Sequence, residues 1–181
     1  MADLLKEEKR ETSEILQLVG FKIGQEEFGI NILSVHEIIK VIDITTVPNA
    51  SDYIAGVINL RGRIIPIVHL RKRLKMPVIE TNKNTRIIVV EINEKTIGFI
   101  VDEVQEVLRI STDITEKPPE LVSGLDSEYI TSVAKLEDRL LILLDLEKTL
   151  ANDDIKELNS IASKNKNIVN WPIKLIIVFD N

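Results

Sequence analysis

An internal duplication constrains the fold of this chain more than any other feature. The segment VINLRGRIIPIVHLRKRL (57–74) returns 76 positions later as VAKLEDRLLILLDLEKTL (133–150), and no gap is needed to match the two. A second match pairs residues 21–41 with residues 90–110 at an offset of 69. Self-similarity at a fixed spacing is the signature of a repeated structural unit. The two halves of the chain therefore share one plan.

The residue types and their spacing predict that each copy is made of strands. Short apolar runs alternate with turns such as Gly24-Gln25-Glu26-Glu27, and only 4% of residues are aromatic, so the core must be built largely from Ile, Val and Leu. Branched side chains of this kind favour strands. Each copy is too short for strand-helix-strand units but suits a small barrel, whose closure removes exposed sheet edges. We therefore predict an all-β chain of two five-stranded barrels.

The domain boundaries follow from the duplication and from composition. We expect a charged arm at 1–14, a first barrel at 15–83, a second barrel at 84–150, a C-terminal helix at 151–166 and a tail at 167–181. The helix is indicated by acids in its first turn and by Ile155, Leu158 and Ile161 at three-residue spacing. The sequence leaves open whether terminal strands are exchanged between the barrels. It also leaves open whether the tail is an edge strand, a self-association segment or an addition foreign to the domain.

Composition excludes several classes of function. The net charge of −6 argues against a surface that neutralises many phosphates, so nucleic acid is not an expected partner. The chain has no cysteine, and no apolar run approaches the roughly 20 residues that span a bilayer. The first 14 residues are charged and lack the apolar core of a signal peptide. We expect a cytoplasmic protein that does not insert into membranes.

The sequence contains no constellation that indicates catalysis. Its two histidines, His36 and His69, have no second ligand at helical spacing, and no phosphate loop or nucleophile motif is present. A hydrolase or transferase would need an acid, a base and a nucleophile that converge, which the duplicated core does not supply. We expect no enzyme activity, no cofactor and no metal site.

The differences between the copies point to function in the first one. Gly56, Asn59, Arg61 and Gly62 do not recur, because the second copy has Ser132, Lys135, Glu137 and Asp138 at those positions. Barrel packing does not require this change, so a surface role for Arg61 is one interpretation. A solvated turn charge is the other. Pro66 favours the first interpretation, because proline in a strand suggests an open rim that can receive a partner.

Three separated segments carry a resemblance to a known family. GVINLRGRIIPIVHLR, FGINILSVHEI and GFIVDEVQEVLRI resemble the CheW family of bacterial chemotaxis coupling proteins, and the resemblance covers about residues 15–163. It implies a non-catalytic adaptor with two SH3-like barrels that bridges chemoreceptor cytoplasmic hairpins and the histidine kinase CheA. It also implies a protein that is monomeric alone and works within receptor arrays. The alternative is a regulatory module of another two-component pathway.

The resemblance also implies which residues bind these partners. The positions that match the receptor contact are Val35, Glu37, Gly56, Asn59, Arg61 and Gly62. The positions that match the kinase contact are Val19, Ile32 and Val35, so Val35 belongs to both sets. His69 stands where many members of the family carry Asp or Asn.

Overall fold

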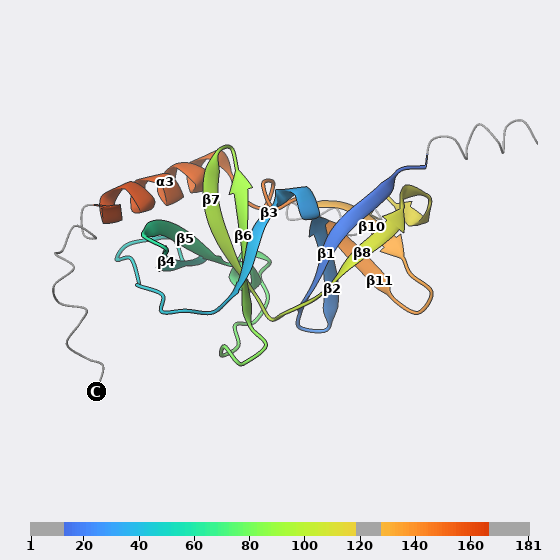
Figure 1. Cartoon of the computed structure of the whole chain (residues 1–181), viewed down its shortest axis with the longest axis horizontal. Coiled ribbons are helices and arrows are strands. Elements are labelled where there is room, and N and C mark those ends of the chain that lie inside the picture. The colour runs from blue at the N-terminus through green and yellow to red at the C-terminus, as the bar shows by residue number, and fades with distance from the viewer. Residues whose placement is uncertain (1–12, 119–127, 167–181) are drawn as a thin grey trace, which may run out of the picture.

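The computed structural model describes residues 13–118 and 128–166, which form two β-sheets and one C-terminal helix (Figure 1). The strands are β1 (Ile15–Ile23), β2 (Glu26–Asn31), β3 (Val35–Lys40), β4 (Ile54–Leu60), β5 (Arg63–His69), β6 (Arg86–Ile92), β7 (Lys95–Val101), β8 (Glu103–Ser111), β9 (Thr115–Glu116), β10 (Ile130–Lys135) and β11 (Leu140–Leu144). The helices are η1 (Ile32–Ser34), α2 (Leu70–Arg73), η2 (Thr112–Ile114) and α3 (Asn152–Lys166). The prediction of a mainly β chain with a C-terminal helix is confirmed. The predicted tail and most of the predicted arm lie outside the described residues.

Each sheet takes strands from both copies of the duplication. Sheet A has the order β8-β1-β2-β11-β10-β9, and sheet B has the order β3-β6-β7-β5-β4. The first hairpin of one copy thus pairs with the later strands of the other copy. The boundary at residues 83 and 84 separates the two copies in the sequence, but it does not separate the two sheets in space. Sheet B has the five strands that were predicted, and sheet A gains a sixth from the two-residue strand β9.

The two sheets are built in the same register. A parallel pairing joins β2 to β11 with Gly29 opposite Leu143, and another joins β7 to β5 with Gly98 opposite Ile67. A Cβ atom on Gly98 would lie 2.5 Å from Ile67 Cδ1. These residues match at the offsets of 69 and 76 that the sequence shows. The duplication therefore appears in space as two sheets with matching strand orders and matching parallel pairings.

Pro66 does not mark an open rim, and the prediction made from it is wrong. Its strand β5 lies inside sheet B, between β7 and β4. The parallel ladder with β7 begins only at Ile67, so Pro66 lies before the first residue of that ladder. The missing N–H of proline is tolerated there for the same reason that it is tolerated at a strand's edge.

Three apolar clusters hold the molecule together. One lies within sheet B around Ile58 and Ile87, and one lies within sheet A around Leu18 and Leu141. The third, which we call the central core, joins residues of both sheets with those of α3. Because β1 contributes Leu18 to one cluster and Val19 to another, both faces of this strand are buried. Burial of apolar surface on two faces accounts for much of the Ile and Val content.

Candidate functional site

The tip of the β4–β5 hairpin is a two-residue turn made by Arg61 and Gly62. Leu60 pairs with Arg63 on either side of it. The φ angles of Arg61 and Gly62 are 52° and 83°, and positive values at both central positions are typical of the hairpin turn that suits the twist of a sheet. The side-chain oxygen of Asn59 accepts a hydrogen bond from Gly62 N at 2.9 Å. Three predicted receptor residues therefore form one local structure.

Arg61 makes a forked ion pair with Glu37. Its two terminal nitrogens lie 3.0 and 3.1 Å from the two carboxylate oxygens. Glu37 lies on β3 and the turn follows β4, which are the two edge strands of sheet B. The pair thus bridges the two edges of the sheet. The side chain of Arg61 is still 75% exposed, so the guanidinium can reach a partner protein.

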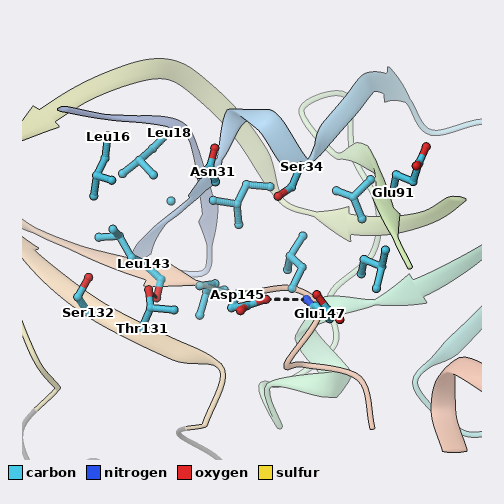
Figure 2. Close-up of a pocket in the computed structure, with 16 residues that line it drawn as sticks. Leu16, Leu18, Asn31, Ser34, Glu91, Thr131, Ser132, Leu143, Asp145 and Glu147 are labelled. Carbon is cyan, nitrogen blue, oxygen red and sulfur yellow. Dashed lines mark hydrogen bonds between the residues drawn. The ribbon is translucent and has the colours of Figure 1, made fainter. Parts of the chain in front are cut away.

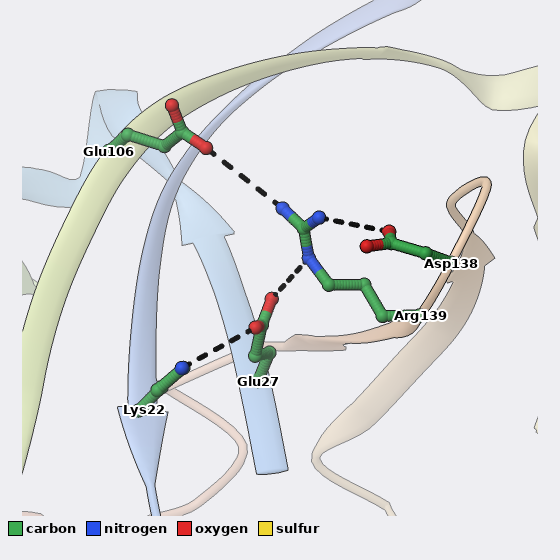
Figure 3. Close-up of polar contacts among 5 residues, drawn as sticks. All are labelled: Lys22, Glu27, Glu106, Asp138 and Arg139. Carbon is green, nitrogen blue, oxygen red and sulfur yellow. Dashed lines mark hydrogen bonds and ion pairs between the residues drawn. The ribbon is translucent and has the colours of Figure 1, made fainter. Parts of the chain in front are cut away.

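In the second copy a different arginine, between β10 and β11, lies near the corresponding glutamate (Figure 3). Glu106 is the counterpart of Glu37, and it lies 4.0 Å from Arg139, which also binds Glu27 at 2.8 Å and Asp138 at 3.1 Å. At the counterpart of Arg61 stands Glu137, which is exposed. Only the first copy therefore places a cation in the turn itself, and this supports a role for Arg61 beyond closure of the sheet.

The structure separates the remaining predicted residues into two groups. Val35 and Ile32 are half-buried, and each packs against the central core with part of its surface exposed. Val19 is only 3% exposed, so it lies behind this surface and not on it. Gly56 is buried as well, and a Cβ atom there would lie 2.2 Å from the carbonyl oxygen of Thr45. The resemblance matched Gly56 to the receptor contact, but the group that approaches Gly56 closely is the chain's own Thr45.

Leu33 is an exposed residue that the sequence analysis missed. It lies in η1, where Asn31 Oδ1 accepts a hydrogen bond from Leu33 N at 2.9 Å, and 89% of Leu33 is exposed. The signal was an apolar residue directly after a capping Asn, outside the alternation of the flanking strands. A fully exposed leucine beside Ile32 adds to the apolar surface available for binding.

A buried ion pair joins α2 to the junction of β7 and β8, and the β1–β2 turn donates a hydrogen bond to it. Arg71 of α2 is 6% exposed, and its Nε donates to Asp102 Oδ1 at 2.8 Å. Gly24 N, in the β1–β2 turn of sheet A, donates to the other carboxylate oxygen at 2.7 Å. Burial raises the pKa of Asp102, but the hydrogen bonds from Arg71 and Gly24 outweigh it and hold the pKa below its usual value.

His69 precedes α2 and does not cap it. Its side chain makes no capping hydrogen bond, and its Nδ1 is a buried side-chain atom without a partner among the described residues. Burial, together with Lys72 and Arg71, lowers the pKa of His69 below 6.5. Its counterpart Asp145 does accept bonds, from Glu147 N at 3.0 Å and from Lys148 N at 3.4 Å. A side chain that caps α2 from position 69 would accept hydrogen bonds from the next backbone N–H groups, as Asp145 does in the second copy.

We expect His69→Asn to stabilise the protein by about 1 kcal/mol near neutral pH, because it supplies an N-cap and removes an unpartnered nitrogen. The unfolded chain binds a proton at His69 below pH 6.5 while the folded chain resists it, so stability falls as pH drops through that range. When the pH falls from about 7.5 to about 5.5, His69→Asn should lose less stability than the unmodified chain. Urea unfolding at both pH values measures this. The matched control is His36→Asn, because His36 is exposed on β3. The prediction is contradicted if the stability of His69→Asn depends on pH as strongly as that of the unmodified chain.

The described residues contain no group of three or more metal-binding side chains. Within residues 13–118 and 128–166, no helix has the length and apolar character to cross a bilayer. The candidate site consists of an exposed polar turn and a half-buried apolar surface.

Comparison with known proteins gives consistent matches. The CheW-like domain family matches residues 17–154. The chain is 33% identical to a chemotaxis protein CheW of Treponema pallidum, over 80% of this chain and 88% of that protein. It is 36% identical to a chemotaxis protein CheW of Klebsiella aerogenes, over 78% of this chain and 86% of that protein.

A solved structure agrees with the fold. The crystal structure of the scaffolding protein TtCheW from Thermoanaerobacter tengcongensis matches with a TM-score of 0.71 at 35% identity, over 78% of this chain and 96% of that one. This chain belongs to the family of CheW-like domain proteins.

Proposed function

We propose that this protein is a non-catalytic chemotaxis scaffold that couples the cytoplasmic hairpins of chemoreceptors to the histidine kinase CheA. The observation that supports it most is the family match over residues 17–154, together with relatives that are named chemotaxis proteins and a scaffolding protein. The protein acts in the cytoplasm, is monomeric on its own and needs no cofactor. Its contribution is to hold two partners in one array, where several weak contacts act together.

The proposed receptor contact is the surface around the Arg61 turn. It consists of Arg61, Gly62 and Asn59 at the tip of the hairpin, with Glu37 and Val35 on β3 beside them. Gly56 belongs to this contact only indirectly, because it is buried beneath the segment of Thr45. A guanidinium that is both positioned by a carboxylate and exposed can donate forked hydrogen bonds to carboxylates or carbonyls of a receptor helix.

The proposed kinase contact is the apolar surface of Ile32 and Val35. Both side chains keep part of their surface exposed, and Val19 supports them from below. Apolar contacts of this kind exclude water and make neighbouring polar contacts stronger. Val35 lies at the point where the receptor and kinase surfaces meet.

Co-sedimentation tests the function directly. The full chain is mixed with receptor-containing membranes, with CheA, or with both, and the bound fractions are measured. We expect the chain to sediment with receptor membranes and to bring CheA with it. If it binds CheA-type kinases without any receptor dependence, the alternative of a regulatory module in another two-component pathway is favoured.

The Arg61 turn can be tested with a charge swap. We expect Arg61→Glu to abolish most receptor-dependent kinase activation while changing stability by about 1 kcal/mol or less, since exposed ion pairs contribute little. The double variant Arg61→Glu with Glu37→Arg restores an ion pair across the sheet edges but presents a reversed charge. The double variant should regain the stability of the unmodified chain, but it should not regain receptor-dependent kinase activation.

Kinase activity in receptor membranes and urea unfolding measure the two effects separately. The matched control is Arg63→Gln, because Arg63 lies next to the turn and donates to Thr96 Oγ1 at 2.8 Å on the same sheet. Full activation by Arg61→Glu, or recovery of activation in the swapped variant, would show that the arginine acts only in closing the sheet.

A further inference from the structure

A cleft of about 410 Å³ lies between the two sheets, beside the η1 segment that carries Ile32 and Leu33 (Figure 2). Leu16 and Leu18 of β1 line one side, and Leu143 of β11 lines the other. Glu91 of β6 and Glu147 after β11 lie at the end of the cleft nearer to sheet B, and Ser34 of η1 lines it as well. None of the residues proposed above for receptor or kinase binding lines this cleft. Its lining combines leucines with three carboxylates, and one of these, Asp145, already pairs with Lys148 at 3.8 Å.

The matching strand pairing of the two sheets shows which residues stand at the corresponding place on the other side of the duplication. At the offsets of the duplication, Glu147 corresponds to Arg71, Leu33 to Asp102, and Asn93 to Gly24. On that other side Arg71 is buried against Asp102, and Met76 Cε lies 3.4 Å from the position of a Cβ atom on Gly24. The chain's own segment 71–77 thus supplies a guanidinium and an apolar side chain there.

Among the described residues, no arginine or lysine lines the cleft. Glu147 takes the place of the arginine, and its Oε1 accepts a hydrogen bond only from the neutral amide of Asn93, at 3.0 Å, among the described residues. Glu91 is exposed, and within the described part of the chain its carboxylate has no hydrogen bond or ion pair. At the counterpart of Asp102 stands Leu33, which is 89% exposed in the middle of η1. Acidic and apolar groups are present, and the cation that joins them on the other side is missing.

We propose that this cleft binds a segment of a partner protein that carries an arginine or lysine flanked by apolar side chains. The cation lies between Glu91 and Glu147, and the apolar side chains cover Leu16 and Leu18. Charge-assisted hydrogen bonds to carboxylates beside an apolar surface favour this chemistry over an acidic or wholly apolar segment. This inference goes beyond the proposed function, because it assigns a second binding surface that the receptor and kinase contacts leave unused.

The probe for the test is the peptide LRKRLKMPVI, which has the sequence of residues 70–79 and includes the side chains that fill the opposite place. Fluorescence anisotropy of the labelled peptide is measured with the full chain. We expect binding that weakens about ten-fold or more in Glu91→Gln with Glu147→Gln, because this variant removes the two carboxylates that would accept charge-assisted hydrogen bonds from the peptide. The control, Glu137→Gln with Asp138→Asn, removes the same charge from the exposed tip of sheet A and should change binding by less than about two-fold.

Each other outcome decides against the proposal. Equal weakening by both double variants, equal binding of a scrambled peptide, or no binding at all would show that the cleft does not recognise this chemistry. Stronger peptide binding by Lys174→Gln would show that the chain's own basic residue between Ile173 and Leu175 competes for the cleft, which overturns the assignment to a partner protein. Circular dichroism of every variant confirms that the fold is retained.

Discussion

Asp102→Ala should destabilise the protein by about 3 kcal/mol or more, because it leaves the buried guanidinium of Arg71 without its counter-charge. Arg71 is 6% exposed and gives Asp102 two hydrogen bonds, at 2.8 and 2.5 Å. Gly24 N also loses its acceptor. The pair connects the β1–β2 turn of sheet A with α2 of sheet B, so its loss should also loosen the packing between the sheets. Urea unfolding measures the loss of stability.

A double-mutant cycle separates the charge from the packing. Arg71→Met with Asp102→Leu removes both charges and keeps apolar volume, so it should be more stable than Asp102→Ala or Arg71→Met alone. If the double variant loses the sum of the two single losses, the ion pair is not the cause. A matched control is Asp52→Ala, because Asp52 pairs with the neighbouring Lys72 at 3.0 Å but its side chain is 90% exposed.

The same pair predicts the response to acid. The pKa of Asp102 is lower in the folded chain than in the unfolded chain. A depressed carboxyl pKa contributes stability above the unfolded value of about 3.9 and loses it as pH falls through the folded value. Asp102→Ala should therefore flatten the acid limb of the stability curve below about pH 4.

The sequence was sufficient for the class of fold but not for the way the strands pair. Alternation of apolar residues and the two offsets predicted short strands in two equal copies, and both features are present. The exchange of strands could not be predicted, because the hairpin β1–β2 shows the same apolar pattern whether it pairs with β3 to β5 or with β8 to β11. Pairing partners depend on contacts far apart in the sequence, which a single pattern does not encode.

Local parts of the candidate site could be predicted from the sequence, but parts that depend on contacts between distant strands could not. Asn59, Arg61 and Gly62 form a local turn, and local chemistry can be read from neighbouring residues. Val19 is buried because sheet B covers the second face of β1, and this follows only from the arrangement of the two sheets. The partnership of Arg61 with Glu37 spans 24 residues and depends on the closure of sheet B. Leu33 was missed because it lies in a short helix that the strand pattern did not predict.

Gly56→Ala should cost about 3 kcal/mol or more, because it combines backbone strain with a steric clash. Gly56 has a φ of 144°, and the added Cβ atom would lie 2.2 Å from Thr45 O and 2.9 Å from Ile44 Cγ2. The segment of Thr45 must then move away from β4, where Thr45 and Val57 exchange two backbone hydrogen bonds at 2.8 and 2.9 Å. Amide hydrogen exchange at Thr45 and Val57 should become faster, and urea unfolding measures the loss of stability.

Gly62→Ala is the matched control for this prediction. Gly62 also has a positive φ, of 83°, but a Cβ atom there would meet nothing within 4 Å, so the cost is only that of the backbone conformation, about 1 kcal/mol. The comparison decides why glycine stands at position 56 in the first copy and Ser132 in the second. If Gly56→Ala weakens receptor binding without any change in stability or in exchange at Thr45, then Gly56 contacts the receptor directly. If the two losses occur together, as we expect, the glycine acts by letting the chain pack against itself beneath the receptor-binding turn.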